Sequence, residues 1–301
     1  MRLLALLARR LPPRAARGLG RGLGRGAFVL GVRRRVSLDN LERALGREYD
    51  AGARRRIAAA AYEHLGTCLM EFLGLPATSA AERRARLDIE GLEHARAALA
   101  AGRGAILVSG HYGNWEVASA CAAAHGLPLT FVVQPLGNRA VDRLAVEIRT
   151  RAGIEVLRRG MALRRVHRTL AANRLVCFMC DQDARRRGAF VPLFGVPAST
   201  PKGAAQLALR LQVPFIPGIN RRLADGRQRM RFFAPIAPPP GASEEEGVRA
   251  LLAAFNSLLE AAVREEPSQY WWAHRRWKTE PPPEARETMG EPAPTPGRSS
   301  R

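Results

Sequence analysis

A short apolar run that ends in a tight turn constrains this chain more than any other feature. Residues 106–108 are apolar and are closed by Ser109 and Gly110, a pattern that predicts a buried strand followed by a turn. A helical pattern resumes near Asn114. In open α/β sheets, ligands bind where strands end and helices begin. His111 stands in this turn, so we expect it to face a ligand.

The spacing of His111 and Glu116 suits a general base and the group that orients it. A carboxylate that accepts one N–H of a neutral imidazole leaves the other ring nitrogen free to take a proton. We therefore expect Glu116 to orient His111, with backbone amides near Gly113 and Asn114 meeting a developing oxyanion. The structural alternative is that His111 caps the helix and Glu116 faces solvent.

Alternating strand and helix patterns predict the fold class. The expected strands are residues 106–108, 129–133, 154–157, 175–179, 213–219 and 229–234. The expected helices in this region are residues 90–99, 139–151, 161–172, 201–211 and 243–264, the last opened by a capping box. This rhythm predicts an α/β fold with a mainly parallel or mixed central sheet flanked by helices.

The first 35 residues form a basic, Gly-rich arm. Its arginines alternate with apolar side chains, which predicts a segment that lies on anionic headgroups. Its apolar runs at 3–7 and 27–32 fall far short of the roughly 18 to 20 residues that span a bilayer. After the arm, residues 37–73 carry a helical pattern broken around 50–52, which predicts two helices.

A formal net charge of +21, carried almost entirely by arginine, predicts an anionic partner. Acidic lipid or an acidic carrier protein fits better than nucleic acid, because no RNA-recognition signature, zinc finger or aromatic-interleaved basic stripe accompanies the charge. A coding bias toward arginine is the alternative explanation for part of the surplus.

Cys177 and Cys180 have the C-x-x-C spacing of zinc and thiol-exchange sites. Cys177 lies within the apolar run 175–179 and Cys180 directly follows it, and positions three apart point to opposite faces of a strand. We therefore expect two buried, inert thiols in a reducing compartment.

The stretch Ser-Gly-His-Tyr-Gly-Asn-Trp-Glu at 109–116 resembles a sequence block of the late acyltransferases of lipid A biosynthesis, within the wider lysophospholipid acyltransferases. Further blocks follow in that family's order: residues 134–138 with Asp142 and Arg143, then 181–183, 190–195 and 269–278. The resemblance covers roughly residues 35–280. It implies a glycerolipid-acyltransferase-like domain at 36–278 with an N-terminal helical region. Residues 279–301, rich in Pro, Glu, Ser and Arg, are expected to form a disordered tail.

The resemblance also implies that Arg149 and Asp181 belong to the active site, because the family has Arg and Asp at the matching places. We expect Arg149 to bind a phosphate or the oxyanion through its planar fork, and Asp181 to hold Arg149 in place. The alternative for Arg149 is a solvated helix face.

The segment Ser199-Thr-Pro-Lys202 matches the S-x-x-K pattern of penicillin-binding enzymes but lacks its companion motifs. We interpret it as a helix N-terminus at which Ser199 and Thr200 bind an anionic part of the substrate.

The resemblance and the dyad predict an enzyme that moves a fatty acyl group from acyl-acyl carrier protein or acyl-CoA to a lipid hydroxyl. The acceptor is expected to be a lipid A precursor or a related glycolipid or lysophospholipid, and no metal or cofactor is expected. The expected location is the cytoplasmic face of the bacterial inner membrane, with peripheral or monotopic attachment. One alternative is a thioesterase or lipid hydrolase that uses water at the same dyad. Another is a basic adaptor that binds membrane or nucleic acid.

Overall fold

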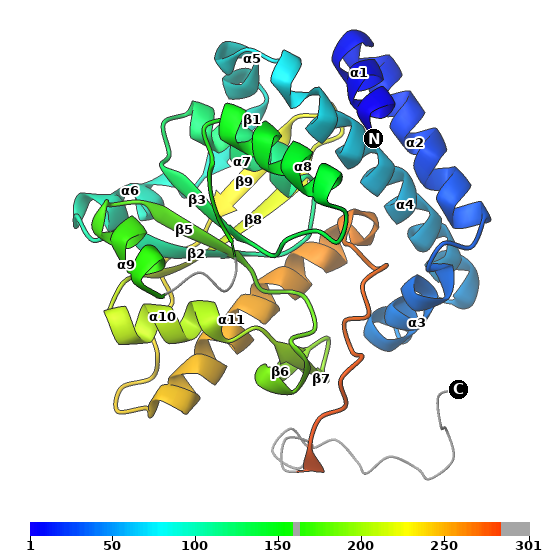
Figure 1. Cartoon of the computed structure of the whole chain (residues 1–301). Helices are drawn as coiled ribbons and strands as arrows, with labels where there is room; N and C mark the ends of the chain where they lie inside the picture. Colours follow the sequence, from blue (N-terminus) through cyan, green and yellow to red (C-terminus); the bar gives the residue numbers. More distant parts are fainter. Residues whose placement is uncertain (159–162, 284–301) are drawn as a thin grey trace.

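A central sheet lies between two layers of helices (Figure 1) in the computed structural model, which describes residues 1–158 and 163–283. The strands of this sheet are β1 (Leu87–Glu90), β2 (Ala105–Ser109), β3 (Leu129–Val133), β4 (Glu155–Arg158), β5 (Leu175–Met179), β8 (Phe215–Arg222) and β9 (Gln228–Phe232). Their order is β1-β9-β8-β2-β5-β3-β4, and only the β8–β9 pair is antiparallel. The expected α/β class with a mainly parallel, mixed sheet is confirmed.

The two faces of the sheet are covered by different helices. One face packs against α6 (Leu92–Ala100), α7 (Trp115–Ala124) and α8 (Arg139–Arg151). The other packs against α9 (Leu163–Ala171), α10 (Gly203–Leu211) and α11 (Glu244–Glu265). Central strands buried on both faces need continuous apolar runs, which explains the composition of β2.

Local sequence signals set several element boundaries. The Asn138 side chain accepts hydrogen bonds from the Ala140 and Val141 amides and so begins α8. The capping box expected at Ser243 is present and begins α11. Residues 161–162 of the expected helix 161–172, and the tail beyond 283, lie outside the described residues. The short elements β1 and α5 (Ala80–Ala85) were not expected, because each is too brief to carry a periodic pattern.

The N-terminal region is helical and contains α1 (Arg2–Arg10), α2 (Pro13–Val29), α3 (Arg34–Leu45) and α4 (Ala51–Gly74). Within it, α2 lies along α4 (Figure 1). Glycines explain the close approach: a Cβ on Gly24 would lie 1.9 Å from the Tyr62 carbonyl oxygen, and one on Gly20 would lie 2.5 Å from that of Gly66. The glycine content of the expected arm therefore serves helix packing. No helix in the described ranges is long and apolar enough to cross a bilayer.

A small antiparallel hairpin stands beside the main sheet. It consists of β6 (Ala189–Leu193) and β7 (Val196–Thr200), joined by Phe194 and Gly195, which both have positive φ. Cys177 and Cys180 are buried in hydrophobic clusters on opposite sides of the sheet, as their spacing predicts.

Candidate active site

The candidate site forms where two adjacent parallel strands end. Ser109 of β2 is paired in register with Met179 of β5, and the Cys180 amide donates to the Ser109 carbonyl at 2.9 Å. His111 and Asp181 are each two residues beyond this pair, so the chain delivers them to the same place.

Asp181 holds the backbone and the ring of His111. Its Oδ1 lies 2.7 Å from His111 Nδ1, and its Oδ2 accepts the His111 backbone N–H at 2.7 Å. Burial raises the pKa of Asp181, but the electrostatic interaction with His111 and the hydrogen bonds from it outweigh this effect and hold the pKa below its ordinary value. The expectation that Glu116 orients His111 is wrong, because Asp181 occupies that position.

Glu116 instead binds Arg149. Arg149 Nε donates to Glu116 Oε2 at 2.9 Å, and Nη2 donates to Oε1 at 2.5 Å, which joins α7 to α8. The guanidinium also lies over the Phe72 ring of α4, 5.8 Å from its centre. Burial lowers the pKa of Arg149, but the Glu116 carboxylate more than offsets this and raises it. The expectation that Asp181 holds Arg149 is therefore also wrong, although all four expected residues lie in this region.

Two tryptophans flank the His111 ring. The ring centres of Trp115 and Trp271 lie 4.7 and 4.9 Å from it. The Trp271 amide donates to the His111 carbonyl at 3.1 Å, so the segment after α11 crosses the turn. Gln182 Nε2 lies 3.5 Å from His111 Nε2, the nitrogen that Asp181 leaves free. Sequence analysis did not assign Gln182 or Trp271 to the site, although both stand in the family-like blocks.

Gly113 and Asn114 have structural partners. Gly113 has a φ of 62°, and its N–H donates to the Gln269 carbonyl at 3.1 Å. The Asn114 side chain accepts the Val117 amide at 3.3 Å and donates to Glu71 Oε2 at 2.8 Å. The Gly113 amide is therefore already used, and the expectation that it meets an oxyanion is wrong. Asn114 acts as the cap of α7.

Ser199 and Thr200 are fully buried at the end of β7. Arg276 Nη1 donates to the Ser199 carbonyl and Nη2 donates to Thr200 Oγ1, both at 2.6 Å. The helix α10 begins only at Gly203. The expected anion-binding helix N-terminus at Ser199 and Thr200 is wrong, because the β6–β7 hairpin continues through both residues.

Comparison with known proteins agrees with this geometry. The sequence profile of the family described as bacterial lipid A biosynthesis acyltransferase matches residues 2–279. The chain belongs to this family. The lipid A biosynthesis lauroyltransferase of Escherichia coli strain K12 is 31% identical over 269 residues, which are 87% of this chain and 85% of that protein. Because the family match begins at residue 2, it includes the N-terminal helices.

Other relatives are named for a different lipid or a different acyl group. The phosphatidylinositol mannoside acyltransferase of Mycolicibacterium smegmatis is 29% identical over 73% of this chain and 72% of its own. The lipid A biosynthesis palmitoleoyltransferase of E. coli K12 is 27% identical over 83% of this chain and 80% of its own. The protein is thus an O-acyltransferase of a family that acts on glycolipids.

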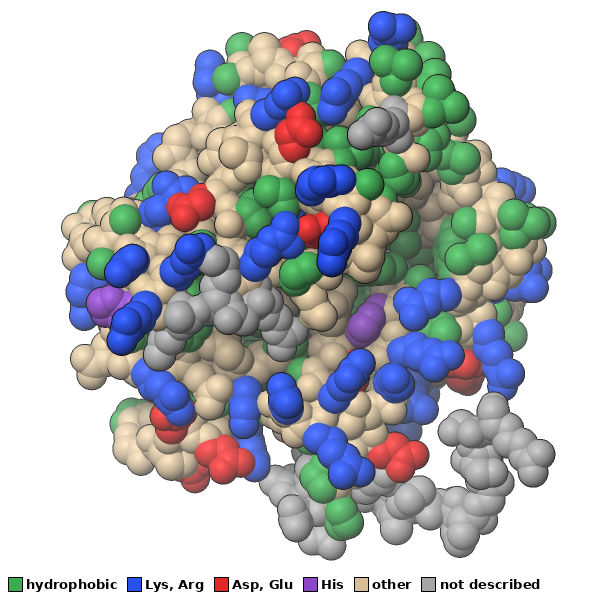
Figure 2. Space-filling model, viewed as in Figure 1, with side chains coloured by type: hydrophobic (Ala, Val, Ile, Leu, Met, Phe, Trp, Pro, Cys, Tyr) green, Lys and Arg blue, Asp and Glu red, His purple; other side chains and the backbone are tan. Residues whose placement is uncertain are grey.

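A basic pocket of about 1260 Å³ adjoins the site of this acyltransferase. Gln182 and His274 line it, as do the cationic residues Arg33, Arg185, Arg186, Arg187, Arg275 and Lys278. Figure 2 shows Lys and Arg side chains around a hollow on this face, with a histidine at its edge. Asp183, the acidic side chain of the lining, accepts hydrogen bonds from Thr279. The pocket therefore carries a large surplus of positive charge.

Proposed function

We propose that this protein transfers a fatty acyl group from acyl-acyl carrier protein or acyl-CoA to a hydroxyl of a lipid A precursor or a related glycolipid or lysophospholipid. The observation that carries the proposal is the Asp181–His111 pair, which leaves His111 Nε2 beside Gln182 at the edge of a basic pocket. Membership in an acyltransferase family supports acyl transfer as the reaction that this pair serves.

In the proposed mechanism, Asp181 accepts the Nδ1–H of His111 and so keeps Nε2 unprotonated. Nε2 takes the proton of the acceptor hydroxyl as its oxygen attacks the thioester carbonyl. The resulting tetrahedral intermediate collapses with cleavage of the C–S bond, and the thiolate takes the proton back from His111. The acyl group passes directly from sulfur to oxygen, and the sequence of steps uses no metal or further cofactor.

Gln182 is the side chain best placed to assist this chemistry. Its amide nitrogen lies 3.5 Å from His111 Nε2, so it can donate to an oxygen that reacts there. We assign it the stabilisation of the thioester oxygen as negative charge develops. The bidentate Glu116–Arg149 pair positions α7, which carries Trp115 against the His111 ring.

The basic pocket is proposed to hold the phosphate groups of a substrate. Both thioester donors carry the acyl chain on a phosphopantetheine arm, and arginine binds phosphate oxygens through paired hydrogen bonds. Replacing Arg275 and Lys278 together with Gln should raise KM for the donor much more than it lowers kcat, because these residues bind at a distance from the reacting carbonyl.

Peripheral attachment to the cytoplasmic face of the inner membrane is proposed for the N-terminal helices. The large apolar side chains exposed in the described ranges are Met1, Leu3, Leu6, Leu23, Val29, Leu30, Val32 and Leu136, almost all within this region. Figure 2 shows the corresponding green patches over the N-terminal helices, next to basic side chains. Apolar side chains bordered by arginine favour binding at an anionic bilayer surface.

The test is an assay of the purified full chain with acyl-acyl carrier protein and acyl-CoA, each offered with a lipid A precursor, a mannosylated lipid or a lysophospholipid. Mass spectrometry should detect a lipid that gains one acyl chain, and His111→Ala should abolish most of the gain. Thioester loss that is equally fast without any lipid acceptor would instead identify a thioesterase.

A further inference from the structure

A second basic pocket lies away from His111, between α2, α4 and the β8–β9 turn. It has a volume of about 470 Å³, which is within the range of small-ligand sites. Arg14, Arg17 and Arg21 line it from α2, and Arg222 lines it from the end of β8. The spacing of three and four residues places the α2 arginines on one face of that helix.

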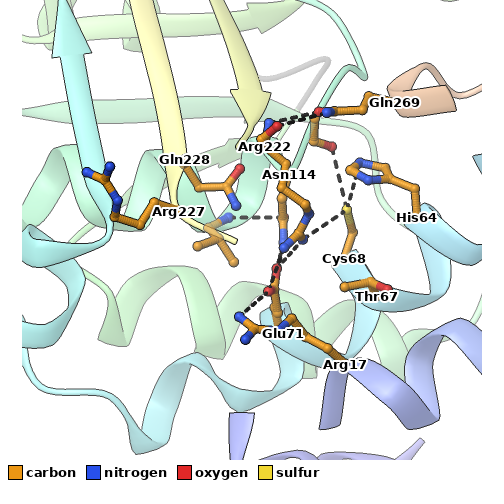
Figure 3. A network of polar contacts seen from close by, with 12 residues as sticks. Arg17, His64, Thr67, Cys68, Glu71, Asn114, Arg222, Arg227, Gln228 and Gln269 are labelled. Atoms are coloured by element: carbon orange, nitrogen blue, oxygen red, sulfur yellow. Dashed lines mark hydrogen bonds and ion pairs between the residues drawn. The ribbon is translucent and has the colours of Figure 1, made fainter. Parts of the chain in front are cut away.

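The acidic groups around this pocket already have partners. Glu63 pairs with Arg25 at 3.2 Å, and Asp225 pairs with Arg227 at 2.7 Å. At the floor, both terminal nitrogens of Arg222 donate to Glu71, whose Oε1 is also 3.8 Å from Arg17 Nη1 (Figure 3).

The two remaining arginines supply the surplus charge. Among the contacts of the described residues, Arg14 and Arg21 have no acidic partner, and both are exposed at the rim. The Nε of Arg222 is buried and has no hydrogen-bond partner among the described residues. Positive charge therefore remains for an anion on the exposed Arg14 and Arg21 side chains.

The α2 backbone that carries Arg14, Arg17 and Arg21 is held in place by helix packing. Gly20 and Gly24 bring the α2 backbone against that of α4, so α2 cannot move away without losing this contact. The Arg17 guanidinium lies against Gly226 in the β8–β9 turn, where a Cβ would be only 2.8 Å from Nη1. A ligand that enters between these elements meets the Arg17 guanidinium already in place, and a preformed donor lowers the entropic cost of binding.

We propose that this pocket binds a phosphate ester group and is a second anion site, separate from the pocket beside His111. Arginine forks match the oxygens of a phosphate, and the pocket has room for the phosphate and a small attached group such as glycerol. The phosphate comes either from a lipid headgroup or from a soluble phosphate ester. The α1 and α2 helices also carry the exposed apolar side chains proposed to contact the bilayer, so the pocket belongs to the same N-terminal region.

The floor of the pocket is joined to the turn that carries His111. Glu71 accepts hydrogen bonds from Arg222 and also from Asn114, which caps α7 (Figure 3). Gln269 links the Arg222 backbone to the Gly113 amide. Through these hydrogen bonds, Glu71 connects an arginine of the pocket to the turn that carries His111.

Binding is measured on the full chain, independently of any acyltransferase activity. The probes are inorganic phosphate and sn-glycerol 3-phosphate in titration calorimetry, and vesicles of phosphatidylcholine with or without phosphatidylglycerol in co-sedimentation. The test variant is Arg14→Gln with Arg21→Gln. The matched control is Arg96→Gln with Arg103→Gln, which removes the same charge from exposed positions outside the pocket. A second test variant, Ala60→Glu, places a negative charge on an exposed lining position.

The expected result is that wild type and control bind glycerol phosphate alike, while both test variants bind it about tenfold more weakly or worse. If the source is a lipid headgroup, the test variants should also lose binding to vesicles with phosphatidylglycerol, and glycerol phosphate should compete. Binding of soluble phosphates without any difference on vesicles would assign the site to a soluble ester. Equal losses in test and control variants for both kinds of probe would overturn the proposal, because only bulk charge would then matter.

Discussion

Asp181 accepts hydrogen bonds from both the backbone and the ring of His111, at 2.7 Å in each case, although the two residues are 70 positions apart. Their contact follows from the in-register pairing of β2 and β5. A carboxylate held by two N–H groups cannot turn away from the imidazole. The His111 tautomer is therefore fixed by the sheet rather than by the local His-x4-Glu spacing.

The first prediction concerns this pair. His111→Ala should lower kcat by about 10² to 10⁴, the usual contribution of a general base. Asp181→Asn should cause a loss approaching that size, because the amide favours the wrong tautomer. The double variant should be little worse than His111→Ala alone, since the two residues act as one unit. Steady-state kinetics with unchanged circular dichroism checks this, and near-normal turnover of His111→Ala would exclude the mechanism.

A second double-mutant cycle tests the ion pair between Glu116 and Arg149. Glu116→Gln and Arg149→Lys should each impair transfer, because the bidentate contact needs both the carboxylate and the planar fork. Their combined effect should be close to that of the poorer single variant. In contrast, Asp181→Asn and Arg149→Lys should be additive in ΔΔG‡, because the structure gives these residues different partners. A strong coupling between Asp181 and Arg149 would contradict the observed pairing.

Gln182→Ala tests the proposed oxyanion donor. Removal of one such donor should lower kcat by about 10² with little change in KM, because the hydrogen bond strengthens only as charge develops. Gln206→Ala removes an amide from the exposed surface of α10 and is the matched control. A change in KM alone would assign Gln182 to substrate binding instead.

Glycine substitutions on α2 should separate packing from helix propensity. Gly24→Ala should destabilise the fold by about 1–3 kcal/mol, because its Cβ would meet the α4 backbone. Gly22→Ala should stabilise it by about 0.5–1 kcal/mol, because no atom lies within 4 Å of that Cβ and alanine favours helix. Thermal unfolding in the same buffer measures both. Similar effects of the two changes would mean that α2 does not pack on α4 in solution.

His64 gives stability a defined pH dependence. Burial, reinforced by the charge of Arg222, lowers the pKa of His64 from 6.5 to about 4. Between these values the unfolded chain binds a proton that the folded chain does not, so the stability contributed by neutral His64 falls as the pH drops from 6.5 toward 4. Unfolding midpoints measured across this range should fall less steeply in His64→Gln than in wild type. Identical slopes would show that His64 is not kept neutral by the fold.

The sequence by itself determined the elements that local patterns encode. The strands 129–133 and 175–179 and the helix 139–151 have the expected bounds, because apolar runs, a polar cap and helical spacing act over a few residues. The resemblance and the strand ends also selected His111, Glu116, Arg149 and Asp181, which the structure joins in two pairs.

Only the tertiary structure decided which of these side chains meet. The lateral order of strands places β5 beside β2, and that order depends on packing between distant segments. Asp181 therefore reaches His111, and Glu116 is left to pair with Arg149 across two helices. The same holds for Gly20 and Gly24. In the sequence they belong to a basic, Gly-rich arm, and only the neighbouring backbone of α4 shows why a side chain is excluded there.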